Sequence, residues 1–404
     1  MKYYFTLLIV TVYLFGRGDI RGYEDRILNE NVGLNTESLV TKYNYPFEYH
    51  STITEDGYIL SIHRISHSPK NLPNQENERR PVIFMLSGLW CNSGAWLLTG
   101  PEKSLGFLLA DRGYDVWMGN NRGTTHSRNH TTLNPDKGSA FWDFSFDEMG
   151  AYDLPVMIDY VLNYTNQEYV TFIGHSQGST AFFALLSERP EYNDKIKLAI
   201  NFAPAVYLSS AQNPYLPYVN NNINKIKITL KLMGIHEILP MSPWIFNTSN
   251  KFCNDDAITQ DICMELIFMF GGPSHDQFNK TLINVITTHI PAGASARQIY
   301  HLMQTYDTGL FRKYDFGKRK NNKIYGTPEP PTYNVSKVTV PTFLYAGGRD
   351  WMADVKDVTK LSKELPNSIG IQIVDNMSHI DFVWAIDVVP LVYESVFEIL
   401  EKYT

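Results

Sequence analysis

Short, almost uninterrupted apolar runs recur along the chain and alternate with longer stretches whose apolar residues follow helical spacing. The apolar runs cover residues 81–86, 114–118, 170–173, 196–202, 339–345 and 369–374. Strands that are buried on both faces read as continuous apolar runs, so we predict a mostly parallel central sheet. The stretches 102–112, 146–163, 179–189, 355–365 and 389–402 predict helices on both faces of this sheet, which defines an α/β fold.

Two other parts of the chain have patterns of their own. Residues 45–64 alternate around Asp56-Gly57 and predict a β-hairpin, and residues 36–43 predict a short helix before it. Residues 205–338 are rich in asparagine and punctuated by proline, and within them 219–239 has the spacing of an amphipathic helix. We therefore expect a core formed by 19–204 and 339–404, with 205–338 inserted between its two parts.

The N-terminus has the pattern of a secretory signal peptide. Lys2 precedes an apolar run over residues 3–15, and the small residues Gly16 and Gly18 then offer a cleavage site near Asp19. The run is shorter than the roughly 20 residues that span a bilayer, so an uncleaved membrane anchor is the alternative reading. We predict a signal peptide at residues 1–18 and no transmembrane segment after its removal.

The remaining sequence marks agree with a secretory route. Six Asn-x-Ser/Thr sequons occur, and we predict glycosylation at five of them, Asn129, Asn163, Asn247, Asn279 and Asn334. Cys253 and Cys263 are close enough in sequence to close a small disulfide loop, which leaves Cys91 as a buried thiol. The cysteine spacing fits no zinc site, so we expect no metal and no cofactor.

Charge and composition exclude one class of partner. Apolar residues make up 44% of the chain and charged residues 19%, as in a globular protein. The net charge of −7 comes without a basic stripe, so we expect no nucleic-acid partner.

A candidate nucleophile lies between one predicted strand and the next helix. Gly174-His-Ser-Gln-Gly178 follows the strand at 170–173 and precedes the helix at 179–189. Strand, G-x-S-x-G and helix form the nucleophile elbow of α/β-hydrolases, in which a tight turn exposes the serine hydroxyl. An ordinary turn with a surface serine is the alternative, but the flanking elements favour Ser176 as the nucleophile.

The acid and base that such a serine needs follow it in the expected order. The strand at 339–345 ends in Ala346-Gly-Gly-Arg-Asp350, which places Asp350 at the strand end, and His379 follows the last strand as the only histidine after His301. Asp354 and Asp381 are the competing acids, but neither lies at a strand end. We expect His379 to take the Ser176 proton and Asp350 to orient the imidazole, while the backbone amides of Leu89 and Gln177 bind the oxyanion.

Several long motifs resemble one family. They are Thr54-Glu-Asp-Gly-Tyr-Ile-Leu60, Gly113-Tyr-Asp-Val-Trp-Met-Gly-Asn-Asn-Arg-Gly123, Phe141-Trp-Asp-Phe-Ser-Phe-Asp-Glu-Met149 with Tyr152-Asp-Leu-Pro155, Gly347-Gly-Arg-Asp350, and Ser378-His-Ile-Asp-Phe-Val-Trp384. Together with the elbow they resemble the gastric and lysosomal acid lipases, a group of α/β-hydrolases with many insect members. The resemblance implies a helical cap or lid, a triad of Ser176, Asp350 and His379, and a cap disulfide between Cys253 and Cys263. One departure is Ser87-Gly88-Leu89, where the family usually has His-Gly-Leu.

The resemblance implies a secreted or lysosomal lipase that acts on neutral lipids, such as triacylglycerols or cholesteryl esters, at a lipid–water interface. An esterase for short soluble esters, a non-catalytic lipid carrier and a secreted peptidase are the alternatives. The amphipathic stretch 219–239 is then either a helix packed on the core or part of a lid that opens at the lipid surface. The sequence makes no prediction of the oligomeric state.

Overall fold

The computed structural model describes residues 28–71 and 79–403. The predicted signal peptide at 1–18 lies outside the described residues. The predicted short helix is present as α3 (Thr36–Lys42). The predicted hairpin follows it as β1 (Glu48–Ile53) and β2 (Tyr58–Ile65). β1 and β2 pair antiparallel, as Asp56-Gly57 at the turn predicted.

A single large sheet organises the described residues. It has nine strands in the order β1-β2-β4-β3-β6-β7-β10-β11, and β5 pairs with β2. The strands after the hairpin are β3 (Val82–Leu86), β4 (Asp115–Gly119), β5 (Asn129–His130), β6 (Val170–His175), β7 (Ile196–Phe202), β10 (Thr342–Gly347) and β11 (Ser368–Val374). From β4 to β11 along the strand order every pairing is parallel, so the predicted fold class is confirmed.

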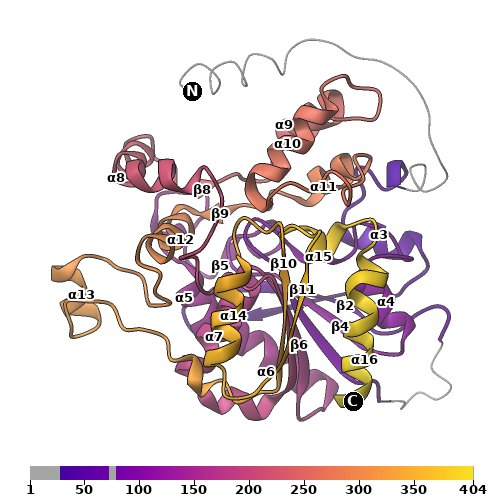
Figure 1. The fold of residues 1–404 in the computed structure, drawn as a ribbon, viewed down its shortest axis with the longest axis horizontal. Helices are drawn as coiled ribbons and strands as arrows, with labels where there is room; N and C mark the ends of the chain where they lie inside the picture. Colours follow the sequence, from indigo (N-terminus) through magenta and orange to yellow (C-terminus); the bar gives the residue numbers. More distant parts are fainter. Residues whose placement is uncertain (1–27, 72–78, 404) are drawn as a thin grey trace.

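Helices cover both faces of the sheet (Figure 1). In that view α6, α7 and α14 lie on one side of the strands, and α4 and α16 lie on the other. Their bounds are α4 (Leu105–Asp111), α6 (Leu154–Thr165), α7 (Gln177–Glu188), α14 (Val355–Glu364) and α16 (Glu394–Tyr403). The strands β3, β4 and β6 are therefore buried along their whole length, as their uninterrupted apolar sequences require. The run at 369–374 differs, because β11 is the edge strand of the sheet and is mostly only partly buried, with Ile373 exposed.

Two predicted helices differ in detail from the observed ones. The stretch 146–163 folds as α5 (Phe146–Glu148), a π-helical turn (Met149–Asp153) and α6. The final helix likewise begins with a π-helical turn (Val389–Tyr393) before α16. Both turns widen the helix by one residue per turn, which apolar spacing alone does not reveal.

Residues 205–338, which we call the cap segment, run mostly over one edge of the sheet, and their part after α13 descends along the side of the sheet toward the start of β10 (Figure 1). Figure 1 shows α8 to α12 above the sheet, whereas α13 projects to the side. The elements are α8 (Leu216–Leu232), β8 (Glu237–Ile238), α9 (Pro243–Phe252), α10 (Gln260–Gly271), α11 (Leu282–His289), β9 (Ala294–Ser295), α12 (Ala296–Thr308) and α13 (Lys318–Ile324).

The amphipathic helix predicted at 219–239 is shorter and begins earlier than expected. It is α8, which ends at Leu232, because Gly234 then adopts a φ of +69° that stops the helix. The predicted disulfide between Cys253 and Cys263 is confirmed and joins the end of α9 to α10. Cys91 is a free thiol, but it is only partly buried.

The structure also describes the surface at the predicted sequons. Asn129, Asn163, Asn247 and Asn334 are exposed, and Asn279 is partly buried. Among residues 28–71 and 79–403, no helix combines the length and the apolar character needed to cross a membrane.

Candidate active site

Ser176 lies at a sharp turn between β6 and α7. Its φ of 53° and ψ of −121° are strained for a residue with a side chain. Two glycines make the turn possible, because a Cβ at Gly174 would lie 2.7 Å from the Phe172 ring and one at Gly178 would collide with the Leu86 carbonyl. The predicted elbow is thus present, with its serine held beside the end of β3.

His379 and Asp350 meet Ser176 from loops at the ends of two neighbouring strands. His379 Nε2 lies 2.7 Å from Ser176 Oγ, and His379 Nδ1 lies 2.8 Å from Asp350 Oδ2. All three side chains are buried, with Asp350 at the inner end of the chain of hydrogen bonds. The structure therefore brings the three predicted residues into one continuous hydrogen-bonded line.

The carboxylate of Asp350 is held by the backbone on its other side. Its Oδ1 accepts hydrogen bonds from the amides of Met352, at 2.7 Å, and Ala353, at 2.8 Å. These bonds leave Oδ2 for the imidazole, and they stabilise the negative charge where it can orient His379.

The two competing acids have structural tasks instead. Asp354 caps α14 by accepting the Lys356 amide at 2.8 Å. Asp381 accepts from Ser274 Oγ at 2.6 Å and from the Ser378 amide at 2.5 Å. Neither carboxylate makes a hydrogen bond to His379, so the geometry favours Asp350 as the partner of the imidazole.

The two predicted oxyanion donors flank the serine. Gln177 is the first residue of α7, so its amide belongs to the positive end of a helix dipole. Gly88 packs so closely on the elbow that a Cβ there would lie 2.9 Å from Ser176 Cβ, and Leu89 comes next in the chain. Within the described parts of the chain, neither the Leu89 amide nor the Gln177 amide has a hydrogen-bond acceptor, so both are free for a ligand.

The loop that carries Leu89 has its own support. The Ser87 hydroxyl, which stands where the family usually has histidine, donates to the Asn92 carbonyl at 3.2 Å. Asn92 in turn donates to the carbonyl of His289 at the end of α11, at 3.0 Å. The substitution at Ser87 therefore leaves the loop hydrogen-bonded within itself and to the cap segment.

Sequence reasoning missed two residues that touch the backbone of His379. His175 Nε2 lies 2.8 Å from the His379 carbonyl oxygen, and the Gly271 carbonyl accepts the His379 amide at 3.1 Å. Burial and the neighbouring His379 lower the pKa of His175 to about 3, so its imidazole is neutral. The position of His175 inside the elbow motif was a signal for its role, whereas no motif pointed to Gly271.

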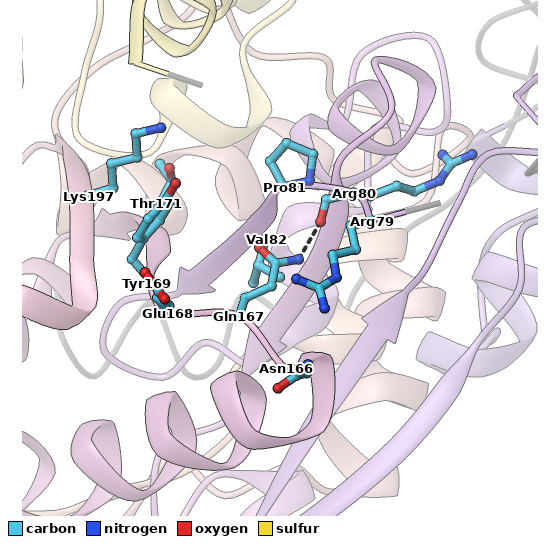
Figure 2. Close-up of a pocket in the computed structure, with 10 residues that line it drawn as sticks. All are labelled: Arg79, Arg80, Pro81, Val82, Asn166, Gln167, Glu168, Tyr169, Thr171 and Lys197. Atoms are coloured by element: carbon cyan, nitrogen blue, oxygen red, sulfur yellow. Dashed lines mark hydrogen bonds between the residues drawn. The ribbon is translucent and has the colours of Figure 1, made fainter. Parts of the chain in front are cut away.

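A pocket of about 510 Å³ lies elsewhere, at the amino ends of the strands (Figure 2). Figure 2 shows charged and polar side chains around it, with the Gln167 amide donating to the Arg80 carbonyl at 2.6 Å. It is lined by residues 79–82, 166–169, Thr171 and Lys197. Because Ser176, Asp350 and His379 follow the carboxyl ends of their strands, this pocket is on the opposite edge and takes no part in their chemistry.

The known families and proteins that this chain resembles are α/β-hydrolases and lipases. Residues 36–100 match the family described as a partial alpha/beta-hydrolase lipase region, and residues 81–226 match the alpha/beta hydrolase fold. Lipase 3 of Drosophila melanogaster is 40% identical over 89% of this chain and 91% of its own length. The human lysosomal acid lipase/cholesteryl ester hydrolase is 35% identical over 100% of both chains.

Solved structures resemble this one in fold at much lower identity. A protein from Sulfolobus solfataricus has a TM-score of 0.57 at 16% identity, over 88% of this chain and 99% of its own. A soluble variant of monoglyceride lipase from Saccharomyces cerevisiae has a TM-score of 0.50 at 16% identity, over 89% of this chain and 99% of its own. On its full-length relatives and its fold, the chain belongs to the acid lipase family of α/β-hydrolases and is a lipase-type carboxylic ester hydrolase.

Proposed function

We propose that the protein hydrolyses carboxylic esters of neutral lipids through an acyl-enzyme formed on Ser176. One observation carries the proposal, namely the line from Ser176 Oγ through both ring nitrogens of His379 to Asp350, with spacings of 2.7 and 2.8 Å. A serine hydroxyl is a weak nucleophile at neutral pH, and a base at hydrogen-bond distance is what activates it.

The proposed reaction has two half-reactions that share the same groups. Ser176 Oγ attacks the ester carbonyl while His379 Nε2 takes its proton, and the imidazolium then protonates the departing alcohol. Water, deprotonated by His379 in its turn, attacks the acyl-enzyme. The bond between the acyl carbon and Ser176 Oγ then breaks, the imidazolium returns its proton to Ser176 Oγ, and the fatty acid leaves. Asp350 holds the imidazole with Nε2 toward the serine and stabilises its transient positive charge.

The amides of Leu89 and Gln177 are the proposed oxyanion donors. The negative charge that develops on the carbonyl oxygen would meet two backbone N–H groups and the positive end of α7. Losing one such donor typically costs a factor of about 10² to 10³ in rate. Since both donors are backbone groups, the Ser87 departure from the family pattern does not remove them.

The outer face of the cap segment supports a lipid substrate. On α8 the exposed side chains include Tyr218, Ile228 and Leu232, which are 72%, 60% and 82% exposed. An apolar stripe of this kind on a surface helix suits contact with a lipid–water interface. We propose that residues 205–338 form a cap through which triacylglycerols or cholesteryl esters reach Ser176. The human relative is a lysosomal acid lipase/cholesteryl ester hydrolase, which supports an ester of this class.

The compartment that we propose is extracellular, with the lysosome as the alternative. The signal-peptide pattern at residues 1–18 and the disulfide between Cys253 and Cys263 both support passage through the secretory route. Exposed side chains at Asn129, Asn163, Asn247 and Asn334 would accept glycans without steric conflict, and Asn279 is the less accessible fifth acceptor.

The variant Ser176→Ala tests the mechanism. It should lose activity on both a soluble short-chain ester and an emulsified triacylglycerol, and it should no longer react with an organophosphonate probe. The matched control is Ser179→Ala, because Ser179 is buried in the same helix and its hydroxyl has no hydrogen-bond partner among the described residues. Undiminished turnover by Ser176→Ala would refute the proposal, and a wild-type protein active only on soluble esters would refute the lipid substrate.

A further inference from the structure

We propose that His175 and Gly271 are positioning residues that hold the backbone of His379 from two sides, so that the inner end of the cap segment helps to set the geometry of the triad. The inference rests on the proposed function, because it assigns a task to groups that act through His379. It changes the role of the cap segment from a cover over the site to a part of the catalytic apparatus.

The first hold on His379 comes from the cap segment. The His379 amide donates to the carbonyl of Gly271, the last residue of α10, at 3.1 Å. The same carbonyl accepts the amide of Trp351 at 3.2 Å, and Trp351 is next to Asp350 in the chain. One carbonyl therefore joins the loop that carries the base to the loop that carries the acid.

The second hold comes from the elbow. His175 Nε2 lies 2.8 Å from the carbonyl oxygen of His379, and a carbonyl can only accept, so Nε2 carries the proton. His175 immediately precedes Ser176, and it is buried. The imidazole therefore fixes the distance between the backbone of the base and the strand that presents the nucleophile.

The end of α10 packs so closely on the loops that carry Asp350 and His379 that no side chain would fit between them. A Cβ at Gly271 would lie 3.2 Å from both His379 Cβ and Ile380 Cγ2. At Gly272, whose φ is +104°, a Cβ would collide with the Arg349 carbonyl. Glycine at these two positions lets the end of α10 approach the loops closely enough for the Gly271 carbonyl to accept the His379 and Trp351 amides.

The chain that leaves α10 adds a further link to the same loop. Ser274 Oγ donates to Asp381 at 2.6 Å, and the same carboxylate oxygen accepts the Ser378 amide at 2.5 Å. Ser378 is the neighbour of His379, so this link fixes the loop one residue before the base. The cap segment thus contacts the loop that carries His379, which we call the base loop, by both backbone and side-chain hydrogen bonds.

This arrangement predicts that changes at the inner end of the cap segment lower kcat even on a soluble ester, which a cap that only covers the site would not do. A soluble ester needs no interface, so its turnover reports the triad alone. We call the two hydrogen bonds that hold the His379 backbone, from His175 Nε2 and to the Gly271 carbonyl, the clamp. If the clamp sets the position of His379, weakening it lowers kcat on a soluble ester and leaves KM nearly unchanged. A misplacement of about 1 Å at a reacting group can cost about 10²-fold in rate.

The test for His175 compares two replacements of similar size. His175→Met removes the donor, whereas the amide of His175→Gln places an N–H near the position of Nε2. We expect kcat on a soluble ester to fall about 10- to 100-fold in the Met variant and to return to within about threefold of wild type in the Gln variant. A folded Met variant with wild-type kcat would overturn the role of His175.

Gly271→Ala tests the cap side of the clamp without a backbone penalty, because Gly271 does not adopt a positive φ. We expect a lower kcat on the soluble ester, since the added methyl pushes on His379 Cβ. The control is Gly309→Ala, also in the cap segment, whose Cβ would meet Ser209 Cβ at 3.1 Å and no atom of the loop that carries His379 within 4 Å. Because Gly309 has a φ of +65°, this control also carries backbone strain that Gly271→Ala lacks, so it is the more severe test of a general structural effect. Equal kcat losses in the two variants would mean a general structural effect and would overturn the proposal.

The two proposals fail in different ways. If Ser176→Ala keeps its activity, the proposed function is wrong whatever His175 does. If Ser176→Ala is inactive while His175→Met and Gly271→Ala both turn over soluble ester at the wild-type rate, the function stands and the clamp is refuted. Should His175→Met fail to fold, the Gly271→Ala and Gly309→Ala pair still decides the outcome.

Discussion

The sheet and the cap segment bury their apolar residues to very different degrees. All of β3 and all of β6 are buried, and both are covered by helices on each face. In α8 only Leu216 is buried, while Leu232 and Met233 are 82% and 66% exposed. Apolar residues in the sheet therefore hold the fold together, whereas those on α8 are available for contact with something outside the protein.

The difference in burial does not coincide with the boundary between the core and the cap segment, because the cap segment has a buried inner end and an exposed outer face. Its inner end at Gly271 is packed against the loop that carries His379, where an added Cβ would lie only 3.2 Å from His379 Cβ. Its outer face on α8 is open. On the two proposals above, the boundary that matters for function runs through the cap segment, between groups proposed to position His379 and groups proposed to contact the lipid.

The largest effect that would sharpen this comparison is expected at the acid in the core. Asp350→Asn should lower kcat about 10⁴-fold on soluble and emulsified esters alike, because an amide stabilises the wrong imidazole tautomer and no imidazolium. The measurement is kcat and KM on both substrates. A loss confined to emulsions would contradict the assignment of Asp350.

Asp354→Asn is the matched control for that variant. An asparagine can still cap α14, where Asp354 now accepts the Lys356 amide. Both substrates should therefore be turned over at nearly the wild-type rate. If Asp354→Asn were as inactive as Asp350→Asn, the acid could not be assigned from the geometry.

The next effect concerns the stability of the core at the elbow. Gly178→Ala should destabilise the protein by about 3 kcal/mol or prevent folding, because the new methyl meets the backbone of β3 at Leu86, which cannot move aside. The control Gly138→Ala has a φ of +74° but open space around the new Cβ, so it should cost only about 1 kcal/mol. Chemical denaturation of both variants measures the difference, and equal costs would argue against a tightly packed elbow.

The same contrast explains how much the sequence could predict. The strands at 82–86, 115–119 and 196–202 were predicted within one or two residues, because a strand buried on both faces requires an apolar residue at nearly every position. The elbow was predicted because its glycines and serine are adjacent in sequence. Asp350 and His379 were then predicted because an α/β-hydrolase has its acid and its histidine after the serine, each on a loop that leaves the carboxyl end of a strand.

What the sequence could not predict depends on contacts between distant segments. The carbonyl of Gly271 reaches His379 across more than a hundred residues, and a glycine at a helix end reads only as a stop signal. The two-residue strand β5 pairs with β2 through Asn129 and His130, neither of which is typical of strands. In the cap segment the helices are only partly buried, so their apolar spacing is a weaker guide to their ends.

A smaller effect is expected on the outer face of the cap segment. The double variant Ile228→Asn/Leu232→Ser should lower activity on emulsified triacylglycerol about 10-fold, since it removes apolar area that would enter the interface. Its kcat on a soluble ester should match the wild type. The control Ile53→Asn changes a side chain that is 55% exposed on β1, and it should leave both activities unchanged. Equal losses on both substrates would show that α8 acts through the triad and not through the interface.

The smallest effect lies at the junction of the two regions and depends on pH. His301, on α12 of the cap segment, is 1% exposed and stacks on Phe146 of α5 with ring centroids 3.9 Å apart. Its Nδ1 lies 3.0 Å from Ser145 Oγ, and its Nε2 lies 2.9 Å from the Arg312 carbonyl. Burial lowers the pKa of His301 from 6.5 to about 3, so the folded protein keeps this imidazole neutral.

The sign of the pH effect follows from proton counting. Below pH 6.5 the unfolded chain binds a proton at His301 that the folded chain refuses until about pH 3, so stability falls as the pH falls through this window. Between pH 6.5 and 5.5, proton binding at His301 in the unfolded chain should lower the free energy of unfolding of the wild type by about 1 kcal/mol. The free energy of unfolding of His301→Gln should not fall by this amount. Urea denaturation of both proteins at pH 5.5, 6.5 and 7.5 measures the difference, with His275→Gln as the control because His275 is 57% exposed. If the free energies of unfolding of wild type and His301→Gln changed in parallel with pH, the junction between the core and the cap segment would not respond to acid through this histidine. The contact between the cap segment and the core would then depend on packing alone.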